Sequence, residues 1–482
     1  MLGWLSDALS PWTTPALLLA GVVAVGAIIG LRGRRLATLA AVVAAGVGLW
    51  QAWKIGPPSG LLDLKIYVLS ARGWLQGGSL YTYLDPVFHL GATYPPIGPL
   101  GFGLLSPLSA EVREITWTAV SLACLAGCAR CAAVLAGVAP AQRRTWTLWA
   151  FALAATTIPV WLTLRLGQVN LVLWLLVLVD VVGLARRSRW AGVGIGVATA
   201  LKLVPGLFIV WLAVTGFGLA RRTADSPRRA LVVDRFGLAA LRATATAALV
   251  TAIGWVLAPD DSWRYWTGLM WDSDRVGRVD DDRNNSLLKA VAELVDPGHL
   301  RTATWLALAT TVVVVALVRA RRAARRGDLL TAVVVVGCAS ALISPISWTH
   351  HLGYLVLALA ALTPTRQRWG TVALVGAWLV LVDPGGLGDQ PATTLVRLVA
   401  MVALVAWMPV VDERSTRSAG DDPEEPVDEV LAPSGDVVAA DGQATDDVGA
   451  PLPHDVGELV EGLAGIEGVG AEDRTPLPRE QR

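Results

Sequence analysis

Six short motifs place charged, hydroxyl or amide side chains in a chain that is otherwise strongly apolar. They are DLKIY (63–67), TYPP (93–96), GQVN (167–170), KLVP (202–205), DDRNNSLL (281–288) and ISPISWTHH (343–351). A polar residue at membrane depth is costly and is usually kept for function. If these motifs reach the same side of a membrane, they form a pocket near its outer leaflet.

Asp63 is the first catalytic candidate, because it comes just after an apolar run of membrane length. A carboxylate at this place can act as a general base that removes a proton from an acceptor hydroxyl. The structural alternative is an interfacial acid that caps a helix beginning at Leu64. We predict the catalytic role.

Lys202 and the adjacent pair His350–His351 are candidates for binding an anion. Lys202 is a single cation deep in an apolar segment, where a lipid phosphate would satisfy it; the alternatives are snorkelling or pairing with Asp180. Neighbouring residues of a helix point about 100° apart, so the two histidines should not chelate one metal together. One of them can bind a phosphate or hydroxyl while the other packs, and the alternative is an interfacial pair.

Further polar residues of the motifs are predicted to contact the substrate. We assign this role to Tyr67, Tyr94, Gln168, Asn170, Asn285 and Ser286. Each has an alternative: GQVN can be a polar turn, and Tyr94 with the prolines after it can shape a loop. The triplet Asn284-Asn285-Ser286 matches a glycosylation sequon, but we favour sugar binding or loop ordering.

Other kinds of chemistry lack their signatures. The chain has no Walker-type phosphate loop, no G-x-G-x-x-G in a strand–helix context and no H-E-x-x-H. We therefore predict no cofactor, no metal site and no nucleic-acid partner. An enzyme acting at the outer face without a nucleotide-binding domain needs a lipid-linked substrate.

The elements that position these residues are membrane helices. Of the 482 residues, 54% are hydrophobic, and the mean hydropathy is +0.54. Repeated apolar runs of about 17–25 residues predict an all-α polytopic membrane protein with roughly 11–13 membrane helices. The 21 tryptophans suit belts at the membrane interfaces.

Basic loops orient the chain, because Lys and Arg are enriched on the cytoplasmic side. The candidate loops are RGRR (32–35), ARRSR (185–189), RRTADSPRR (221–229), RARRAARR (319–326) and TRQR (365–368). Apolar runs at 14–31 and 36–53 then place Asp63 outside, and segment 258–302 becomes an outer loop. Segment 191–217 is too short to cross twice at about 1.5 Å per residue, so we predict a hairpin of short helices with KLVP at its apex. Segment 95–110 is either a thin span or re-entrant.

The C-terminal segment differs sharply from the membrane body. Residues 412–482 carry 19 acidic and 5 basic residues, whereas residues 1–411 carry 35 basic and 20 acidic ones, a net charge of +15. The segment has no aromatic residue and too few apolar ones to fold alone. We predict a catalytic membrane domain over 1–411 and a disordered acidic cytoplasmic tail over 412–482, which can bind a cytoplasmic protein.

Taken in order, the motifs resemble glycosyltransferase family 87 of the GT-C fold. The segments that carry the resemblance are DLKIYVLSARGWLQGGSLY, TYPP, GQVNLVLWLLVLVD, ATALKLVPGLFIVWL, NNSL and SPISWTHH. The resemblance runs from about Asp63 to His351 and does not cover the tail. It implies a polyprenol-phosphate-mannose-dependent α-(1→2)-mannosyltransferase of the inverting type, in a bacterial plasma membrane. The family's catalytic acid corresponds to Asp63, with the active site on the outer face.

These observations predict the function. The enzyme would move a sugar, mannose in α-1,2 linkage, from a polyprenyl-phosphate donor to a cell-envelope glycolipid or lipoglycan, with membrane lipids around it. Asp63 would be the base, and Lys202 with His350 and His351 would hold the donor phosphate. The alternatives are an arabinofuranosyltransferase that uses polyprenyl-phosphate-arabinose and a lipid-glycan transporter. A transporter often shows internal repeats, and the sequence has no convincing one.

Overall fold

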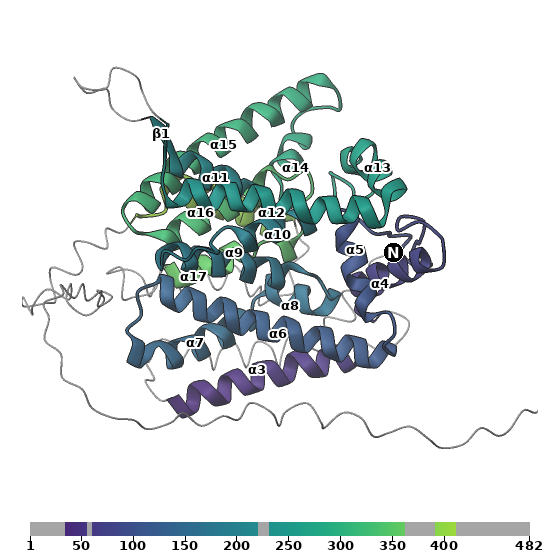
Figure 1. The fold of residues 1–482 in the computed structure, drawn as a ribbon, viewed down its shortest axis with the longest axis horizontal. Coiled ribbons are helices and arrows are strands. Elements are labelled where there is room, and N and C mark those ends of the chain that lie inside the picture. Colours follow the sequence, from purple (N-terminus) through teal and green to yellow (C-terminus); the bar gives the residue numbers. More distant parts are fainter. Residues whose placement is uncertain (1–33, 55–59, 220–230, 362–390, 411–482) are drawn as a thin grey trace, which may run out of the picture. The chain divides into compact units, whose positions relative to one another are not determined.

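The computed structural model describes residues 34–54, 60–219, 231–361 and 391–410, and their regular structure is almost entirely helical (Figure 1). The elements are α3 (Arg34–Lys54), α4 (Leu62–Leu75), α5 (Ile97–Phe102), η1 (Gly103–Leu105), α6 (Ala110–Leu135), α7 (Pro140–Ala155), α8 (Ile158–Leu166), α9 (Asn170–Ala185), α10 (Val193–Leu201), α11 (Gly206–Gly216), β1 (Phe217–Leu219), β2 (Leu231–Val233), α12 (Arg235–Leu257), α13 (Pro259–Thr267), η2 (Leu269–Trp271), α14 (Leu287–Ala292), α15 (His299–Arg325), α16 (Leu329–Ile343), η3 (Thr349–His351), α17 (Gly353–Ala361) and α19 (Pro391–Trp407). The predicted span at 14–31, a second predicted span at the apolar run 369–384 and the predicted tail from 412 lie outside the described residues.

Membrane-crossing helices are present. Three described helices, α6, α12 and α15, are each long and apolar enough to cross a membrane. The pair α7 and α8 passes the same test together but is bent by 73°. The prediction of a helical, multi-pass membrane protein is therefore confirmed. The count of 11–13 helices stays a prediction, because two of the predicted spans lie outside the described residues.

The core is built around α16, which is apolar on every side. All its residues from Leu329 to Leu342 are buried, and α15, α17 and α19 pack around it. The helices approach closely at small residues, as is usual in membranes. A Cβ on Gly337 of α16 would lie 2.1 Å from the ring of Tyr354 in α17, so only glycine fits there.

The predicted hairpin over 191–217 is confirmed. α10 and α11 are separated by a break at 202–205, and both pack along α12. Gly192, which precedes α10, and Gly216, which ends α11, both lie against the first turns of α12, where added Cβ atoms would meet backbone at 2.2 and 1.8 Å. The two helices therefore start and finish at the same end of α12, and Lys202 lies at the far apex.

Segment 97–105 forms only α5 and η1, six and three residues long. At about 1.5 Å per residue this piece is too short to cross a membrane as a helix, which argues against a thin span; the re-entrant alternative stays a prediction. Ser109 then caps α6 by accepting a hydrogen bond from Val112 N. Two three-residue strands, β1 and β2, pair antiparallel next to the start of α12 and are the exception to an all-helical fold within the described residues.

Candidate active site

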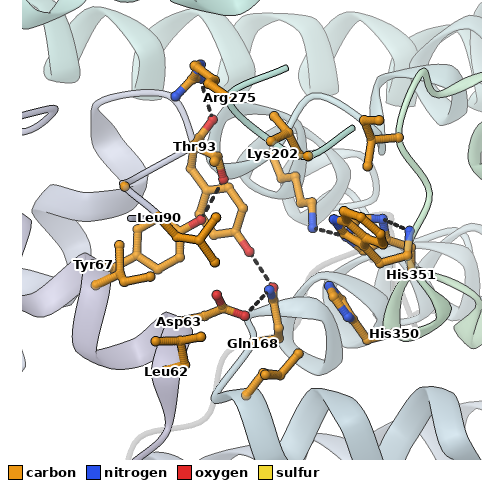
Figure 2. Close-up of a pocket in the computed structure, with 18 of the residues that line it drawn as sticks. Leu62, Asp63, Tyr67, Leu90, Thr93, Gln168, Lys202, Arg275, His350 and His351 are labelled. Carbon is orange, nitrogen blue, oxygen red and sulfur yellow. Dashed lines mark hydrogen bonds between the residues drawn. The ribbon is translucent and has the colours of Figure 1, made fainter. Parts of the chain in front are cut away.

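A cavity of about 510 Å³ lies where α4, α8, the α10–α11 apex, segment 275–283 and the loop before α17 meet. Seven of the ten predicted site residues line its wall: Asp63, Tyr67, Tyr94, Gln168, Lys202, His350 and His351. The other three, Asn170, Asn285 and Ser286, lie behind the wall. The structure thus brings together residues that are almost 290 positions apart in sequence, and Figure 2 shows most of them converging on one space.

Asp63 lies in the first turn of α4 and is held by Gln168. Its Oδ2 accepts a hydrogen bond from Gln168 Nε2 at 2.5 Å (Figure 2). The contact depends on Gly167, which ends α8 with φ +68. A Cβ there would meet the Cβ of Leu64 at 2.7 Å, so glycine permits both the left-handed turn and the close approach of α8 to α4.

The capping alternative for Asp63 is wrong. α4 begins at Leu62, not at Leu64, and its first turn has no side-chain cap. The carboxylate points into the cavity instead. Burial raises the pKa of Asp63 to about 6, while the hydrogen bond from Gln168 and the charge of Lys202 act in the opposite direction. Asp63 belongs to α4, a 14-residue helix that is not one of the membrane-crossing helices. With a pKa of about 6, the Asp63 side chain is mainly a carboxylate at pH 7 and can accept a proton.

Two stacked tyrosines form the wall above Asp63. The rings of Tyr67 and Tyr94 lie 4.3 Å apart and nearly parallel. Tyr94 donates its hydroxyl to Gln168 Oε1 at 2.5 Å, and Tyr67 shares a hydrogen bond of 2.8 Å with Thr93. Gln168 is therefore held at both ends of its amide, which fixes the nitrogen toward Asp63.

Lys202 faces Asp63 across the cavity, beside the histidine turn (Figure 2). Its Nζ donates to Asn170 Oδ1 at 3.1 Å and lies 3.0 Å from His351 Nε2 and 5.1 Å from the centre of the Tyr94 ring. The alternative of a Lys202–Asp180 pair is not what the structure shows, since Asp180 Oδ2 accepts from the backbone of Ile195. The snorkelling alternative does not describe it either, because Lys202 lines the cavity.

The two imidazoles differ in their surroundings. Trp348 N donates to His351 Nδ1 at 3.2 Å, so the ring proton of His351 is on Nε2, the atom that faces Lys202. His350 is 6% exposed, and its Nε2 has no hydrogen-bond partner in the described part of the chain. Their ring planes are nearly perpendicular, at 84°. Both histidines line the cavity, so neither is simply a packing residue.

Asn170 is a link rather than a wall residue. Its Oδ1 accepts from Lys202 and its Nδ2 donates to the carbonyl of His350 at 2.8 Å. Both functions of the amide are used in coupling the cation to the histidine turn. GQVN is indeed a turn, between α8 and α9, but one whose two amides are directed to the two sides of the site.

Asn285 and Ser286 also lie behind the cavity, at 0% and 1% exposure. Asn285 Nδ2 donates to Ser347 O at 3.1 Å, and Ser286 Oγ donates to Pro345 O at 2.9 Å. These contacts fit the loop-ordering alternative, because they attach the start of α14 to the loop that carries the histidines. Neighbouring Asn284, fully buried, does the same: its Oδ1 accepts from Ser347 N at 2.9 Å.

The sequence reasoning did not single out the arginines of the cavity. Arg165, Arg275, Arg278 and Arg283 line it. Arg275 donates to the carbonyls of Ala92 and Thr93 at 2.8 and 2.9 Å and so attaches segment 268–283 to the loop before Tyr94. Three of the four arginines lie in the predicted outer loop, against the preference of Arg for cytoplasmic loops, and this exception is the signal that could have identified them.

Comparison with known proteins identifies the family of this chain. Residues 92–345 match the model of glycosyltransferase family 87. The chain is 31% identical over 363 residues to a polyprenol-phosphate-mannose-dependent alpha-(1-2)-phosphatidylinositol mannoside mannosyltransferase of Mycobacterium tuberculosis, covering 71% of this chain and 80% of that protein.

A related enzyme of a second M. tuberculosis strain, named for phosphatidylinositol pentamannoside, is 32% identical over 373 residues, with 73% of this chain and 78% of that protein covered. A phosphatidylinositol mannoside mannosyltransferase of Mycolicibacterium smegmatis is 31% identical over 368 residues, with 70% and 78% covered. The match covers more than half of the chain, and the relatives extend it over most of the membrane body. This chain is a member of glycosyltransferase family 87, a membrane-embedded glycosyltransferase.

Proposed function

We propose that this enzyme transfers mannose, in α-1,2 linkage, from a polyprenyl-phosphate donor to a glycolipid or lipoglycan acceptor, with Asp63 as general base. The observation that carries the proposal is a single cavity with a carboxylate on one side and a cation with two imidazoles on the other. The names of the relatives support mannose as the sugar, polyprenol phosphate as its carrier and mannosylated phosphatidylinositol as the class of acceptor.

The reaction needs one proton transfer and one displacement. Asp63 takes the proton of an acceptor hydroxyl as that oxygen attacks the anomeric carbon of the donor sugar. The bond from the anomeric carbon to the phosphate oxygen breaks, and polyprenyl phosphate leaves with the electron pair. Attack and departure on opposite sides invert the anomeric centre. Gln168 occupies Oδ2 of Asp63, so Oδ1 is the remaining oxygen for the proton.

The leaving phosphate belongs near Lys202. Lys202 Nζ and His351 Nε2 lie 3.0 Å apart, and an oxyanion beside this pair would accept a hydrogen bond from each. The unpaired Nε2 of His350 supports the same location. Donors fixed in advance around a developing negative charge lower the barrier to its formation.

The proposed orientation places this cavity at the outer face of the plasma membrane and the tail in the cytoplasm. The support is the position of the basic segments: ARRSR (185–189) and RARRAARR (319–326) both adjoin helix ends far from the apex at Lys202. Apolar wall residues such as Leu62, Ile66 and Leu203 suit a site that receives lipid-borne substrates.

The test is transfer by the purified protein in lipid nanodiscs. The donor is radiolabelled polyprenyl-phosphate-mannose, and the acceptor is a phosphatidylinositol mannoside. We expect labelled product from the wild type, without any membrane gradient. Transfer from polyprenyl-phosphate-arabinose alone would replace the donor assignment with the arabinosyl alternative. Movement of the glycolipid across vesicles, with no transfer from either donor, would instead indicate the transporter.

A further inference from the structure

α19 contributes a charged side chain to the protein interior. Arg397 is 1% exposed, in a helix whose other residues are apolar except for two threonines at its start. Removing a charge from water is expensive, and a charge inside a membrane protein is usually functional. α19 also lies outside residues 92–345, the part of the chain that matches the family model.

Arg397 is directed to the turn that carries the histidines. Its Nη1 donates to Thr349 Oγ1 at 3.4 Å. Thr349 directly precedes His350 and begins η3. The carbonyl of His350 accepts a hydrogen bond from Asn170 Nδ2 of α9 at 2.8 Å. The turn is therefore attached to both α19 and α9.

A second contact comes from the preceding turn of α19. Thr394 donates its hydroxyl to Asp282 O at 2.6 Å. Residues three apart lie on the same face of a helix, so Thr394 and Arg397 form one contact face. Segment 282–286 in turn reaches Thr349, because Asn285 Nδ2 lies 3.5 Å from Thr349 Oγ1. The three elements thus meet at one hydroxyl group.

We infer that Arg397 and Thr394 are positioning residues, which hold the histidine turn in the geometry that binds the donor phosphate. This inference rests on the proposed function for the identity of the anion, but not for the existence of the contact. Arg397 acts through Thr349 and the backbone of η3. Misplacement of a binding group by about 1 Å can cost about 10²-fold in rate, so even a small shift of the histidine turn would affect transfer.

The first measurement is steady-state transfer with donor and acceptor varied separately. For Arg397→Met we expect the donor KM to rise by about 10- to 100-fold, with the acceptor KM changed by less than about twofold. Thr349→Val should reproduce the effect and Thr349→Ser should largely restore the wild-type values, because serine keeps the accepting oxygen. The donor KM of the double variant Arg397→Met/Thr349→Val should not exceed that of the more impaired single variant, since both substitutions remove the same Arg397–Thr349 contact.

The matched control is Arg319→Gln. Arg319 of α15 donates to the carbonyl of Met408, just beyond the end of α19, so it secures the same helix at a distance from η3. If Arg319→Gln and Arg397→Met raise the donor KM equally, α19 has only a general packing role and the inference is overturned. An unchanged donor KM in a well-folded Arg397→Met protein also overturns it.

A second readout does not depend on the sugar. The whole chain has five histidines, so ¹⁵N-histidine labelling in nanodiscs gives few imidazole signals. Arg397→Met should shift the His350 and His351 signals, and Arg319→Gln should not. If the wild type proves inactive with mannose but these shifts appear, the proposed donor is wrong and the positioning role stands; if the shifts are absent, the positioning role is wrong.

Discussion

Gln168 donates a hydrogen bond to Oδ2 of Asp63 at 2.5 Å, across 105 residues of sequence. The same amide accepts from Tyr94 through its oxygen, so it is not free to rotate. Oδ2 of Asp63 is thereby fixed by Gln168, which follows α8, and Gln168 is itself held by Tyr94 from the loop before α5.

Replacement of the proposed base should slow transfer without unfolding the protein. Asp63→Asn keeps the size of the side chain and an oxygen that can still face Gln168, but it cannot take a proton. We expect kcat to fall by about 10²–10⁴-fold, the usual contribution of a general base. Asp260→Asn, an exposed acid in α13, is the control and should keep wild-type turnover. Near-normal transfer by Asp63→Asn would show that another group is the base.

The rate should depend on pH in the direction set by a raised carboxyl pKa. Because the pKa of Asp63 is about 6, the base is ionised above that value and protonated below it. We expect kcat/KM to be constant near pH 7.5 and to decrease as the pH falls through about 6. A profile that stays flat down to pH 5 would contradict this assignment. Circular dichroism at each pH checks that the helices persist.

Removal of the Gln168 amide should shift the pH at which kcat/KM begins to decrease. The hydrogen bond from Gln168 stabilises the ionised form of Asp63 and lowers its pKa. In Gln168→Met this effect is lost, so the pKa rises and the midpoint of the profile shifts to higher pH. The measurement is the same pH series for both proteins. A variant that loses activity equally at every pH would assign Gln168 to substrate contact alone.

Lys202 should affect the donor more than the acceptor. Lys202→Met keeps the apolar stem but removes a charge-assisted hydrogen bond, so we expect donor kcat/KM to fall by about 10- to 100-fold. His351→Ala should act in the same direction. Lys289→Met is the control, since it removes a lysine of α14 that pairs with Glu293, just after that helix. If the Lys202 variant alters only the acceptor KM, the donor phosphate does not lie at this cation.

The proposed orientation predicts the labelling of single cysteines in a protein whose four native cysteines have been replaced. Both chosen positions, Asp274 and Arg189, are exposed. A membrane-impermeant thiol reagent should label Asp274→Cys in intact cells, because segment 258–302 is predicted to be outside. Arg189→Cys should be labelled only after permeabilisation. Reaction of both from the same side would refute the topology.

The sequence by itself determined the membrane class, the hairpin at 202–205 and the candidate set. Apolar runs of membrane length, and a proline three residues after a lone lysine, can be recognised in the sequence alone, because the bilayer imposes the same length and polarity on every span. Because polar residues are rare in these apolar segments, Asp63, Lys202 and the histidine pair could be recognised as candidates. The resemblance to the family depended on these residues in their order, and the comparisons confirmed it.

Only the tertiary structure decided what each polar side chain touches. Asn170, Asn285 and Ser286 were predicted to contact sugar, yet their partners are Lys202, Ser347 and Pro345. Motif and spacing do not give the direction of an amide, and a turn between two helices can direct it either way. The contacts of Arg397 and Arg275 join segments 48 and more than 180 residues away. Such contacts arise from the packing of whole helices and connecting segments against one another, so they exist only once the chain has folded.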